Sequence, residues 1–264
     1  IVRMVHANSS GHPGGSLGCA EFLTALYFDV MNHNTDFTMD GINEDIFFLS
    51  NGHISPVFYA VLSRRGYFNI SELATFRRID SRLQGHPTPH EGLEGIRMAS
   101  GSLGQGLSTA IGAALSKKLN NDDSIVYTLH GDGELQEGQV WEAFMYASGK
   151  QVDNLIATID YNQKQIDGTI DEVLPIGNLT AKLEAFDWVV LEELEGNNVE
   201  AIINTLNRAK ELTGKKKPVA IILHTEMGNG VDYMMGTHKW HGSAPNDEQL
   251  SKALSQNTET LGDD

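Results

Sequence analysis

The fold of this chain is decided by two short apolar runs that end in polar residues. Residues 124–133 read SIVYTLHGDG, and residues 155–162 read LIATIDYN. Each run predicts a buried strand, over 124–130 and 155–161, because it is short, continuous and rich in β-branched side chains. The helical pattern between them, at 138–149, completes a strand–helix–strand unit that is typical of a parallel sheet.

Two oxygen donors follow these strands, Asp132 after the first and Asn162 after the second. The carboxyl ends of parallel strands lie at one edge of the sheet, where open α/β folds bind ligands. A carboxylate with an amide oxygen suits Mg²⁺ or Ca²⁺, and the glycines beside Asp132 allow a diphosphate to approach the backbone closely. Each half of the pattern alone is ordinary turn chemistry. The two halves together predict a metal-bridged diphosphate.

The remaining sequence alternates between strand-like and helix-like segments. Strands are expected at 45–50, 188–194 and 218–224, and helices at 17–31, 56–65, 71–78, 105–119, 179–186 and 199–213. This alternation predicts an α/β fold with a mostly parallel sheet and helices on both faces. Residues 79–103 are rich in Gly, Pro and His, and we expect them to form a long functional loop.

The domain organisation expected from these patterns is simple. One domain is predicted over residues 1–245, followed by a polar tail at 246–264 that is a candidate for disorder. The chain opens inside helix-like sequence, which suggests that native residues precede Ile1.

Composition excludes several classes of partner. The 264-residue chain is 40% hydrophobic and 20% charged, as in globular proteins, and its formal net charge is −16. That charge argues against nucleic acid or an anionic membrane as a partner, and it requires any basic pocket to be local or supplied by another chain. The single cysteine, Cys19, excludes an internal disulfide and fits a reducing compartment, so a cytoplasmic protein is expected. No apolar run is long enough to span a membrane, and no signal peptide is visible.

Further motifs narrow the interpretation. They are Gly11–Gly14 (GHPG), Ser50–His53 (SNGH), Gly85–Pro87 (GHP), Gly101–Gly106 (GSLGQG), Glu137-Gly138, Ile166–Gly168 (IDG) and His241–Pro245 (HGSAP). Together with the Gly-Asp-Gly and Asn pair, they resemble the thiamine-diphosphate-binding motif and, in this order, the transketolase family. The resemblance implies the thiamine-diphosphate-binding fold. It also implies transfer of a two-carbon ketol group from a ketose or ketose phosphate to an aldose or aldose phosphate.

The resemblance also assigns cofactor-binding residues. It implies that thiamine diphosphate is held through Mg²⁺ or Ca²⁺, with Asp132, Asn162 and the backbone carbonyl of Lys164 as metal ligands. The Gly133 N–H is expected to meet the diphosphate, and Ile166 to pack on the cofactor rings; the alternative for Ile166 is a plain core residue. The backbone of Gly101, Ser102 and Leu103 is expected to meet the aminopyrimidine, with Ser102 standing where many relatives have Pro.

Five further side chains are assigned to catalysis by the resemblance. His12 and His86 are expected to meet substrate hydroxyls, His53 to contact the diphosphate or lie near the thiazolium, and His241 to lie near both the diphosphate and the reacting carbon. Glu137 is expected to bind cofactor and to face a second acid across a dimer. The alternative for Glu137 is an exposed residue at a helix N-terminus, stabilised by the helix dipole.

The resemblance covers only the diphosphate-binding half of a transketolase. It therefore implies a split enzyme, in which a C-terminal subunit with the pyrimidine-binding domain completes the site, as an α₂β₂ assembly; an artificial truncation is the lesser alternative. Two other functions remain open. One is a subunit of another thiamine-diphosphate enzyme, similar to deoxyxylulose-phosphate synthase or a 2-oxo acid dehydrogenase. The other is a non-catalytic regulatory subunit of the same fold.

Overall fold

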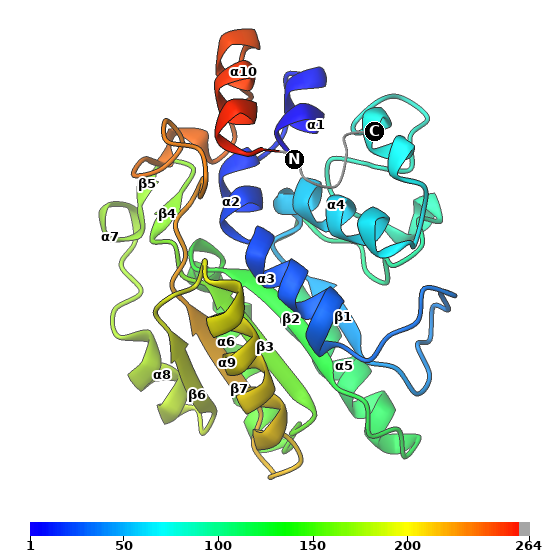
Figure 1. The fold of residues 1–264 in the computed structure, drawn as a ribbon. Coiled ribbons are helices and arrows are strands. Elements are labelled where there is room, and N and C mark those ends of the chain that lie inside the picture. The colour runs from blue at the N-terminus through cyan, green and yellow to red at the C-terminus, as the bar shows by residue number, and fades with distance from the viewer. Residues whose placement is uncertain (259–264) are drawn as a thin grey trace.

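Five strands form one parallel sheet in the computed structural model, which describes residues 1–258 (Figure 1). Their order is β1 (Ile46–Leu49), β2 (Val126–Gly131), β3 (Leu155–Asp160), β7 (Val219–Leu223) and β6 (Val189–Glu193). Every neighbouring pair is parallel, so the predicted sheet is confirmed. Strands β2 and β3 are neighbours inside this sheet, and Gly131 lies beside Asp160 in their register. Their two carboxyl ends therefore meet.

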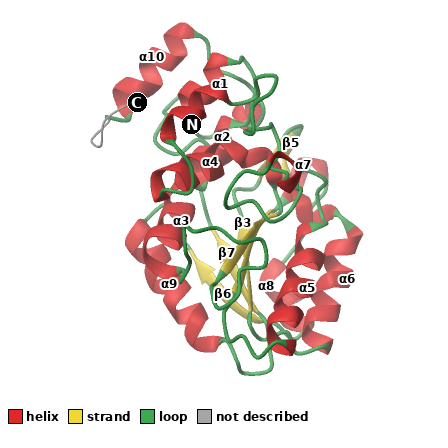
Figure 2. Ribbon diagram, turned by 90° about the vertical axis from the view of Figure 1, so that its right-hand side faces the viewer, coloured by secondary structure: helices red, strands yellow, loops and turns green. Residues whose placement is uncertain are grey.

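Helices cover both faces of the sheet. On one face lie α3 (Ala20–Ala25), α4 (Ser55–Arg65) and α9 (Val199–Leu212), and on the other lie α5 (Gly106–Leu119), α6 (Gly138–Gly149) and α8 (Leu179–Ala185). Figure 2 shows the strands between α3 and α9 on one side and α5, α6 and α8 on the other. Alternate strand residues serve the two cores, because successive side chains point to opposite faces: Phe47 and Leu49 join one, and Ile46 and Phe48 join the other.

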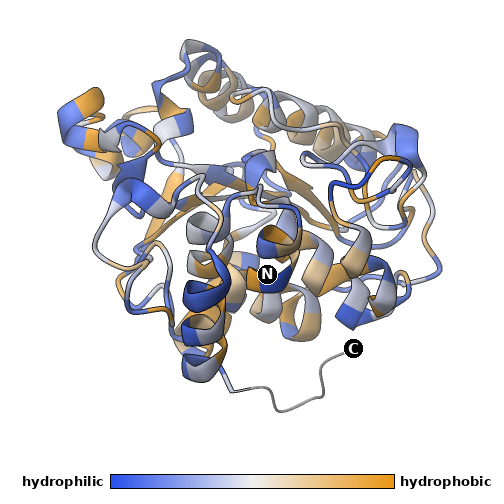
Figure 3. Ribbon diagram, turned by 90° about the horizontal axis from the view of Figure 1, so that it is seen from above, coloured by the Kyte–Doolittle hydropathy of each residue, from blue (hydrophilic) through white to orange (hydrophobic). Residues whose placement is uncertain are grey.

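These helices turn a hydrophobic side toward the core and a hydrophilic side toward solvent. Figure 3 shows hydrophobic strands in the middle of the molecule and hydrophilic and hydrophobic residues alternating along the surrounding helices. Helix α9 begins where the Asn198 side chain accepts hydrogen bonds from the N–H groups of Glu200 and Ala201. Helix α4 ends at Gly66, whose φ of +98° is favourable only for glycine.

The expected helix at 17–31 is not continuous. The chain instead forms α2 (Pro13–Gly18), α3 and a π-helical turn at Leu26–Val30, with a break at Cys19. Close packing accounts for the glycine at this break, because a Cβ on Gly18 would lie 3.0 Å from the Glu226 carbonyl oxygen. The expected helix at 71–78 is a 3₁₀ helix at Ile70–Thr75. Between residues 79 and 103, the only regular element is a 3₁₀ turn at Pro89–Glu91.

Smaller elements complete the described residues. Strands β4 (Lys164–Gln165) and β5 (Gly168–Thr169) form an antiparallel hairpin, followed by α7 (Ile170–Val173). Three short 3₁₀ segments lie at Gly52–Ile54, Gly133–Gln136 and His238–Trp240. The hairpin and the first two of these segments follow strands β3, β1 and β2, at the same edge of the sheet.

The polar tail is helical where it is described. Helix α10 (Asp247–Gln256) starts with a capping box formed by Asn246 and Gln249, and it lies beside α1 (Val2–Ala7) in Figure 1. Ala253 is buried, and Asp247 accepts a hydrogen bond of 2.8 Å from His6. The prediction of disorder is therefore wrong for this segment, because capping and packing on α1 stabilise it. The last part of the predicted tail, 259–264, lies outside the described residues.

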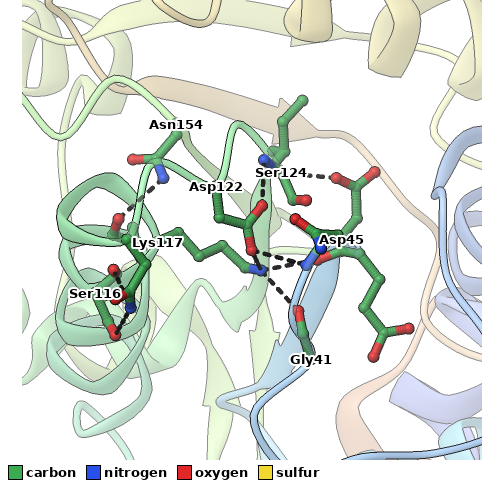
Figure 4. Close-up of polar contacts among 12 residues, drawn as sticks. Gly41, Asp45, Ser116, Lys117, Asp122, Ser124 and Asn154 are labelled. Carbon is green, nitrogen blue, oxygen red and sulfur yellow. Dashed lines mark hydrogen bonds and ion pairs between the residues drawn. The ribbon is translucent and has the colours of Figure 1, made fainter.

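A buried polar network lies at the opposite edge of the sheet, where β1 and β2 begin (Figure 4). The Lys117 ammonium donates to the Gly41 and Glu44 carbonyls at 2.9 Å each and pairs with Asp122 at 2.8 Å. Burial opposes ionisation of Asp122, but the bond from Lys117 holds its pKa below the usual value. Asp45 accepts from the Ile125 N–H at 2.7 Å. This network joins the chain entering β1 to the end of α5.

Candidate functional site

A cavity of about 290 Å³ opens at the carboxyl edge of the sheet. Most of the predicted site residues line it: His12, His53, Gly101, Leu103, Asp132, Gly133, Glu137, Asn162, Lys164, Ile166 and His241. Eight other residues line it as well: Gly15, Asn51, Gly131, Glu134, Gln136, Asp160, Gln165 and Met227. Two predicted residues, His86 and Ser102, are outside this lining. The cavity therefore brings together segments that are up to 229 residues apart in the sequence, from His12 to His241.

Asp132 lies at the tip of β2, where it caps the 3₁₀ turn that follows. Its side chain is only 2% exposed, and one carboxylate oxygen accepts from the Gly133 N–H at 2.7 Å. The other oxygen accepts from the Gln163 N–H, which belongs to the loop after β3. Burial, reinforced by the neighbouring Asp160, raises the pKa of Asp132 to about 8. A cation bound at this carboxylate would favour its ionised form.

Asn162 is oriented by its neighbours. Its amide nitrogen donates to an Asp160 carboxylate oxygen at 2.8 Å, and its amide oxygen accepts from the Lys164 N–H at 2.9 Å. Because Asp160 accepts the amide N–H, the oxygen of Asn162 is turned to the other side, with one lone pair available. The amide therefore presents an oxygen where a hard cation requires one.

Asp160 is the buried support of this arrangement. Besides Asn162, its carboxylate accepts from the Thr225 hydroxyl and interacts with the thiol of Cys19, which is free and buried. Burial raises the pKa of Asp160. Sequence reasoning assigned no role to Asp160, although an acidic residue two positions before a candidate ligand at a strand end is a usable signal for a residue that orients that ligand.

The donor set fits a hard divalent cation whose coordination shell is completed by a bound ligand. Among residues 1–258, no three side chains of His, Cys, Asp or Glu form a metal-binding group. One carboxylate and one amide oxygen are too few for six-coordinate Mg²⁺, which normally keeps waters and binds substrate phosphates. The side chain of Lys164 lies 3.2 Å from Glu226, so this residue has only its backbone carbonyl to offer a cation. These residues fit a metal–diphosphate unit better than a free metal ion.

Four histidines from distant motifs form one cluster. The ring centroids of His12 lie 5.1 Å from His53, 6.5 Å from His86 and 5.6 Å from His241, and those of His53 and His241 are 5.0 Å apart. Burial lowers the pKa of every ring, and the pKa of His12 falls to about 4 through burial, His241, Arg77 and His86. At neutral pH the cluster is therefore a set of neutral imidazoles that both donate and accept hydrogen bonds.

Several polar atoms of this cavity have no protein partner. Among the described residues, His12 Nδ1, His241 Nδ1 and Asn51 Oδ1 are buried without a hydrogen bond. Buried polar atoms are normally satisfied, so orphans gathered at one cavity indicate a polar ligand. Asn51 was not predicted as a site residue, although it lies inside the SNGH motif that indicated His53.

The loop before α5 forms another wall. Gly101 has a φ of +113°, and a Cβ there would lie 2.6 Å from the His86 ring, so the position requires glycine. The His86 ring therefore packs against Gly101, while Leu103 lines the cavity and Ser102 is exposed. Across the cavity, Ile166 is 60% exposed, which disfavours the alternative of a plain core isoleucine.

Two glutamates follow the Gly-Asp-Gly turn and differ in environment. Glu137 is exposed at the N-cap of α6, a position compatible with both of its predicted roles. Glu134 is 1% exposed and accepts hydrogen bonds from three segments of the chain. Sequence reasoning favoured Glu137 and assigned nothing to Glu134, because two of the hydrogen-bond partners of Glu134, Ser50 and Gly104, are distant in sequence.

The family whose description is "Transketolase, thiamine diphosphate binding domain" matches residues 1–259. The chain belongs to the transketolase family. It is 39% identical over 261 residues to a subunit of the apulose-4-phosphate transketolase of Phocaeicola vulgatus, a match that covers 99% of this chain and 91% of that protein. It is also 39% identical over 249 residues to a 6-deoxy-6-sulfo-D-fructose transketolase subunit of Clostridium sp., covering 93% and 88%.

Longer relatives share the same fold. Human transketolase is 36% identical over 242 residues, which is 91% of this chain and 37% of that protein. The solved transketolase of Pichia stipitis in complex with sedoheptulose 7-phosphate superposes with a TM-score of 0.89 and 32% identity, over 97% of this chain and 38% of that one. For the Campylobacter jejuni enzyme the TM-score is 0.87, with 33% identity over 97% and 40%.

These findings confirm the predicted family and the predicted α/β fold. They also show that the chain spans about two fifths of the longer transketolases and most of the relatives that are named as subunits. Among the helices of residues 1–258, none is both long and apolar enough to cross a membrane.

Proposed function

We propose that the chain is the diphosphate-binding, N-terminal subunit of a two-chain transketolase. The assembly transfers a two-carbon ketol group from a ketose or its phosphate to an aldose or its phosphate. One observation carries the proposal: Asp132 and Asn162, at the ends of adjacent strands, share a cavity with His12, His53 and His241. A turn-forming Gly-Asp-Gly with no ligand would not require this convergence.

The cofactor roles follow from the atoms that the cavity presents. Asp132, Asn162 and the Lys164 carbonyl hold Mg²⁺, or Ca²⁺ in its place, and the Gly133 N–H meets the diphosphate. In the structure this N–H donates to Asp132, so binding requires it to be shared or released. Ile166 packs on the cofactor rings, and the backbone of residues 101–103 contacts the aminopyrimidine. Bound thiamine diphosphate supplies the carbon nucleophile and electron sink that ketol transfer requires.

The histidine cluster binds the substrate and transfers protons. Its neutral rings donate to and accept from sugar hydroxyls and move protons at the oxygen atoms where charge develops as the carbon–carbon bond breaks. His12, His53 and His241 line the cavity and form this surface, while the His86 ring packs against Gly101, with its centroid 6.5 Å from that of His12. A sugar that enters over these rings satisfies the orphan nitrogens of His12 and His241.

A partner chain completes the proposed enzyme. The subunit-named relatives are nearly the length of this chain, and the longer transketolases more than twice it, which supports a separate C-terminal subunit with the pyrimidine-binding domain in an α₂β₂ assembly. Exposed Glu137 and Ile166 mark the open side of the cavity. Lys164 is the one Lys or Arg among the lining residues that the structure describes, which supports placing the groups that bind an anionic sugar on the partner. A cytoplasmic location stays a prediction.

Calorimetric titration tests the proposal. Thiamine diphosphate with Mg²⁺ is titrated into the chain alone, into the chain with its partner, and into the Asp132→Ala variant of each. We expect weak binding to the chain alone, tighter binding with the partner and loss of binding in the variant. Turnover of a ketose is expected only with the partner. Unchanged binding in the variant would contradict the metal assignment, and cofactor binding without any turnover by the complete assembly would favour the regulatory subunit.

A further inference from the structure

A single buried carboxylate joins three loops of the cavity. One oxygen of Glu134 accepts hydrogen bonds from the Ser50 hydroxyl, after β1, and from the Gly104 N–H at 2.9 Å, before α5. The other oxygen accepts from the Gly131 N–H at 3.1 Å, at the end of β2. The His130 ring lies 3.6 Å from the first oxygen. One side chain therefore ties together segments that are distant in the sequence.

The loop of residues 101–106 is held at several atoms by this arrangement. The Ser50 hydroxyl that donates to Glu134 also accepts from the Gly106 N–H at 3.1 Å. A Cβ on Gly106 would lie 2.2 Å from the Ser50 Oγ, so the two segments are in direct contact. The Gly104 carbonyl accepts from Gln139 at 2.8 Å. The N–H and the carbonyl of Gly104 are therefore both hydrogen-bonded to side chains of the turn and the helix that follow β2.

We infer that Glu134 is a positioning residue that fixes the 101–106 loop relative to the Gly131–Gly133 turn. This inference rests on the proposed function, in which the turn meets the diphosphate and the loop meets the aminopyrimidine. One side chain then sets the relative position of the two segments that meet the two ends of one cofactor. A loop held in place before the cofactor arrives loses less conformational entropy on binding.

The chemistry of the side chain explains why a carboxylate is required. Three donors converge on Glu134, and an ionised carboxylate is an acceptor at both oxygens. In Glu134→Gln the amide NH₂ faces either the Gly131 N–H or the pair formed by Ser50 and Gly104, so a donor meets a donor. Ser50→Ala is milder, because it removes the link to Gly106 and leaves the Gly131 bond in place.

Two measurements on the full chain separate positioning from general stability. The first is hydrogen exchange at the amides of residues 101–106. The second is the affinity, with Mg²⁺ present, for thiamine diphosphate and for inorganic diphosphate as a probe of the turn alone. We expect at least tenfold faster loop exchange in Glu134→Gln and Ser50→Ala. In Ser50→Ala we expect at least tenfold weaker binding of thiamine diphosphate and less than threefold weaker binding of inorganic diphosphate.

Matched controls remove equivalent groups elsewhere. Glu211→Gln removes an exposed carboxylate from α9, and Ser63→Ala removes a buried hydroxyl from α4; both are expected to behave as the wild type. Wild-type exchange in the loop, or equal weakening of both ligands in Ser50→Ala, would overturn the inference. If the wild type binds neither ligand even with its partner present, the proposed function fails, and loop exchange alone still decides whether Glu134 fixes the loop.

Discussion

Removing one imidazole from the histidine cluster changes how stability depends on pH. Burial, together with His241, Arg77 and His86, lowers the pKa of His12 from 6.5 to about 4. The unfolded chain therefore takes up a proton on this ring at a higher pH than the folded chain does. The stabilising contribution is complete above about pH 6.5 and is lost as the pH falls toward about 4.

The size of the effect follows from the same values. At pH 5 the solution is about 1.5 pH units below the ordinary pKa of 6.5 but still above the folded-state pKa of about 4. Between pH 7.5 and pH 5, this ring therefore lowers the free energy of unfolding by about 2 kcal/mol. Solvent reaches part of the His12 ring, so screening reduces this to about 1 kcal/mol. The His12→Gln variant should therefore lose about 1 kcal/mol less stability than the wild type over this interval.

Urea denaturation followed by circular dichroism at pH 7.5, 6 and 5 measures this difference. Asp132 has a raised pKa and therefore stabilises the fold at low pH, opposite to His12. This contribution is present in both proteins, so it cancels when the free energy of unfolding of the wild type is subtracted from that of the variant. The exposed His90, replaced in His90→Gln, is the control and should follow the wild type. Equal losses in His12→Gln and the wild type would refute the reasoning about the buried cluster.

Two further predictions concern the two edges of the sheet. Asp160→Ala should weaken Mg²⁺ binding in the presence of thiamine diphosphate by about 10–100-fold, because the Asn162 amide loses the acceptor that orients it; calorimetry on the folded variant measures this, and unchanged affinity would contradict the assigned orientation. Lys117→Met should destabilise the fold by about 3 kcal/mol, because it leaves Asp122 buried without its cation; chemical denaturation measures this, and cofactor affinity, measured separately, should stay unchanged because the network lies at the opposite edge.

The strands and the meeting of their carboxyl ends were predictable from local patterns. The two apolar runs around Asp132 and Asn162 are short and continuous, and their order in a strand–helix–strand unit places both ends at one edge. The structure confirms this because β2 and β3 are neighbours with Gly131 beside Asp160. The motif histidines were singled out only through the resemblance to the transketolase family, because a single His beside Gly or Pro in a loop is more often structural.

Contacts between distant segments were not predictable in the same way. The role of Glu134 depends on hydrogen bonds to Ser50 and Gly104, which only the sheet order brings close. The need for glycine at position 18, beside the break at Cys19, depends on packing against a segment more than 200 residues away. The helix after Asn246 was missed because its amphipathic face is short and polar residues dominate, although the capping box was visible in the sequence.

The most direct test of the proposed metal–diphosphate site is an anomalous-scattering map of the assembled enzyme crystallised with thiamine diphosphate and Mn²⁺. We predict one manganese peak between the side-chain oxygens of Asp132 and Asn162, about 2.1 Å from each and from a diphosphate oxygen, as in octahedral sites of hard cations. Bound cofactor with no metal peak at these two residues would contradict the central claim.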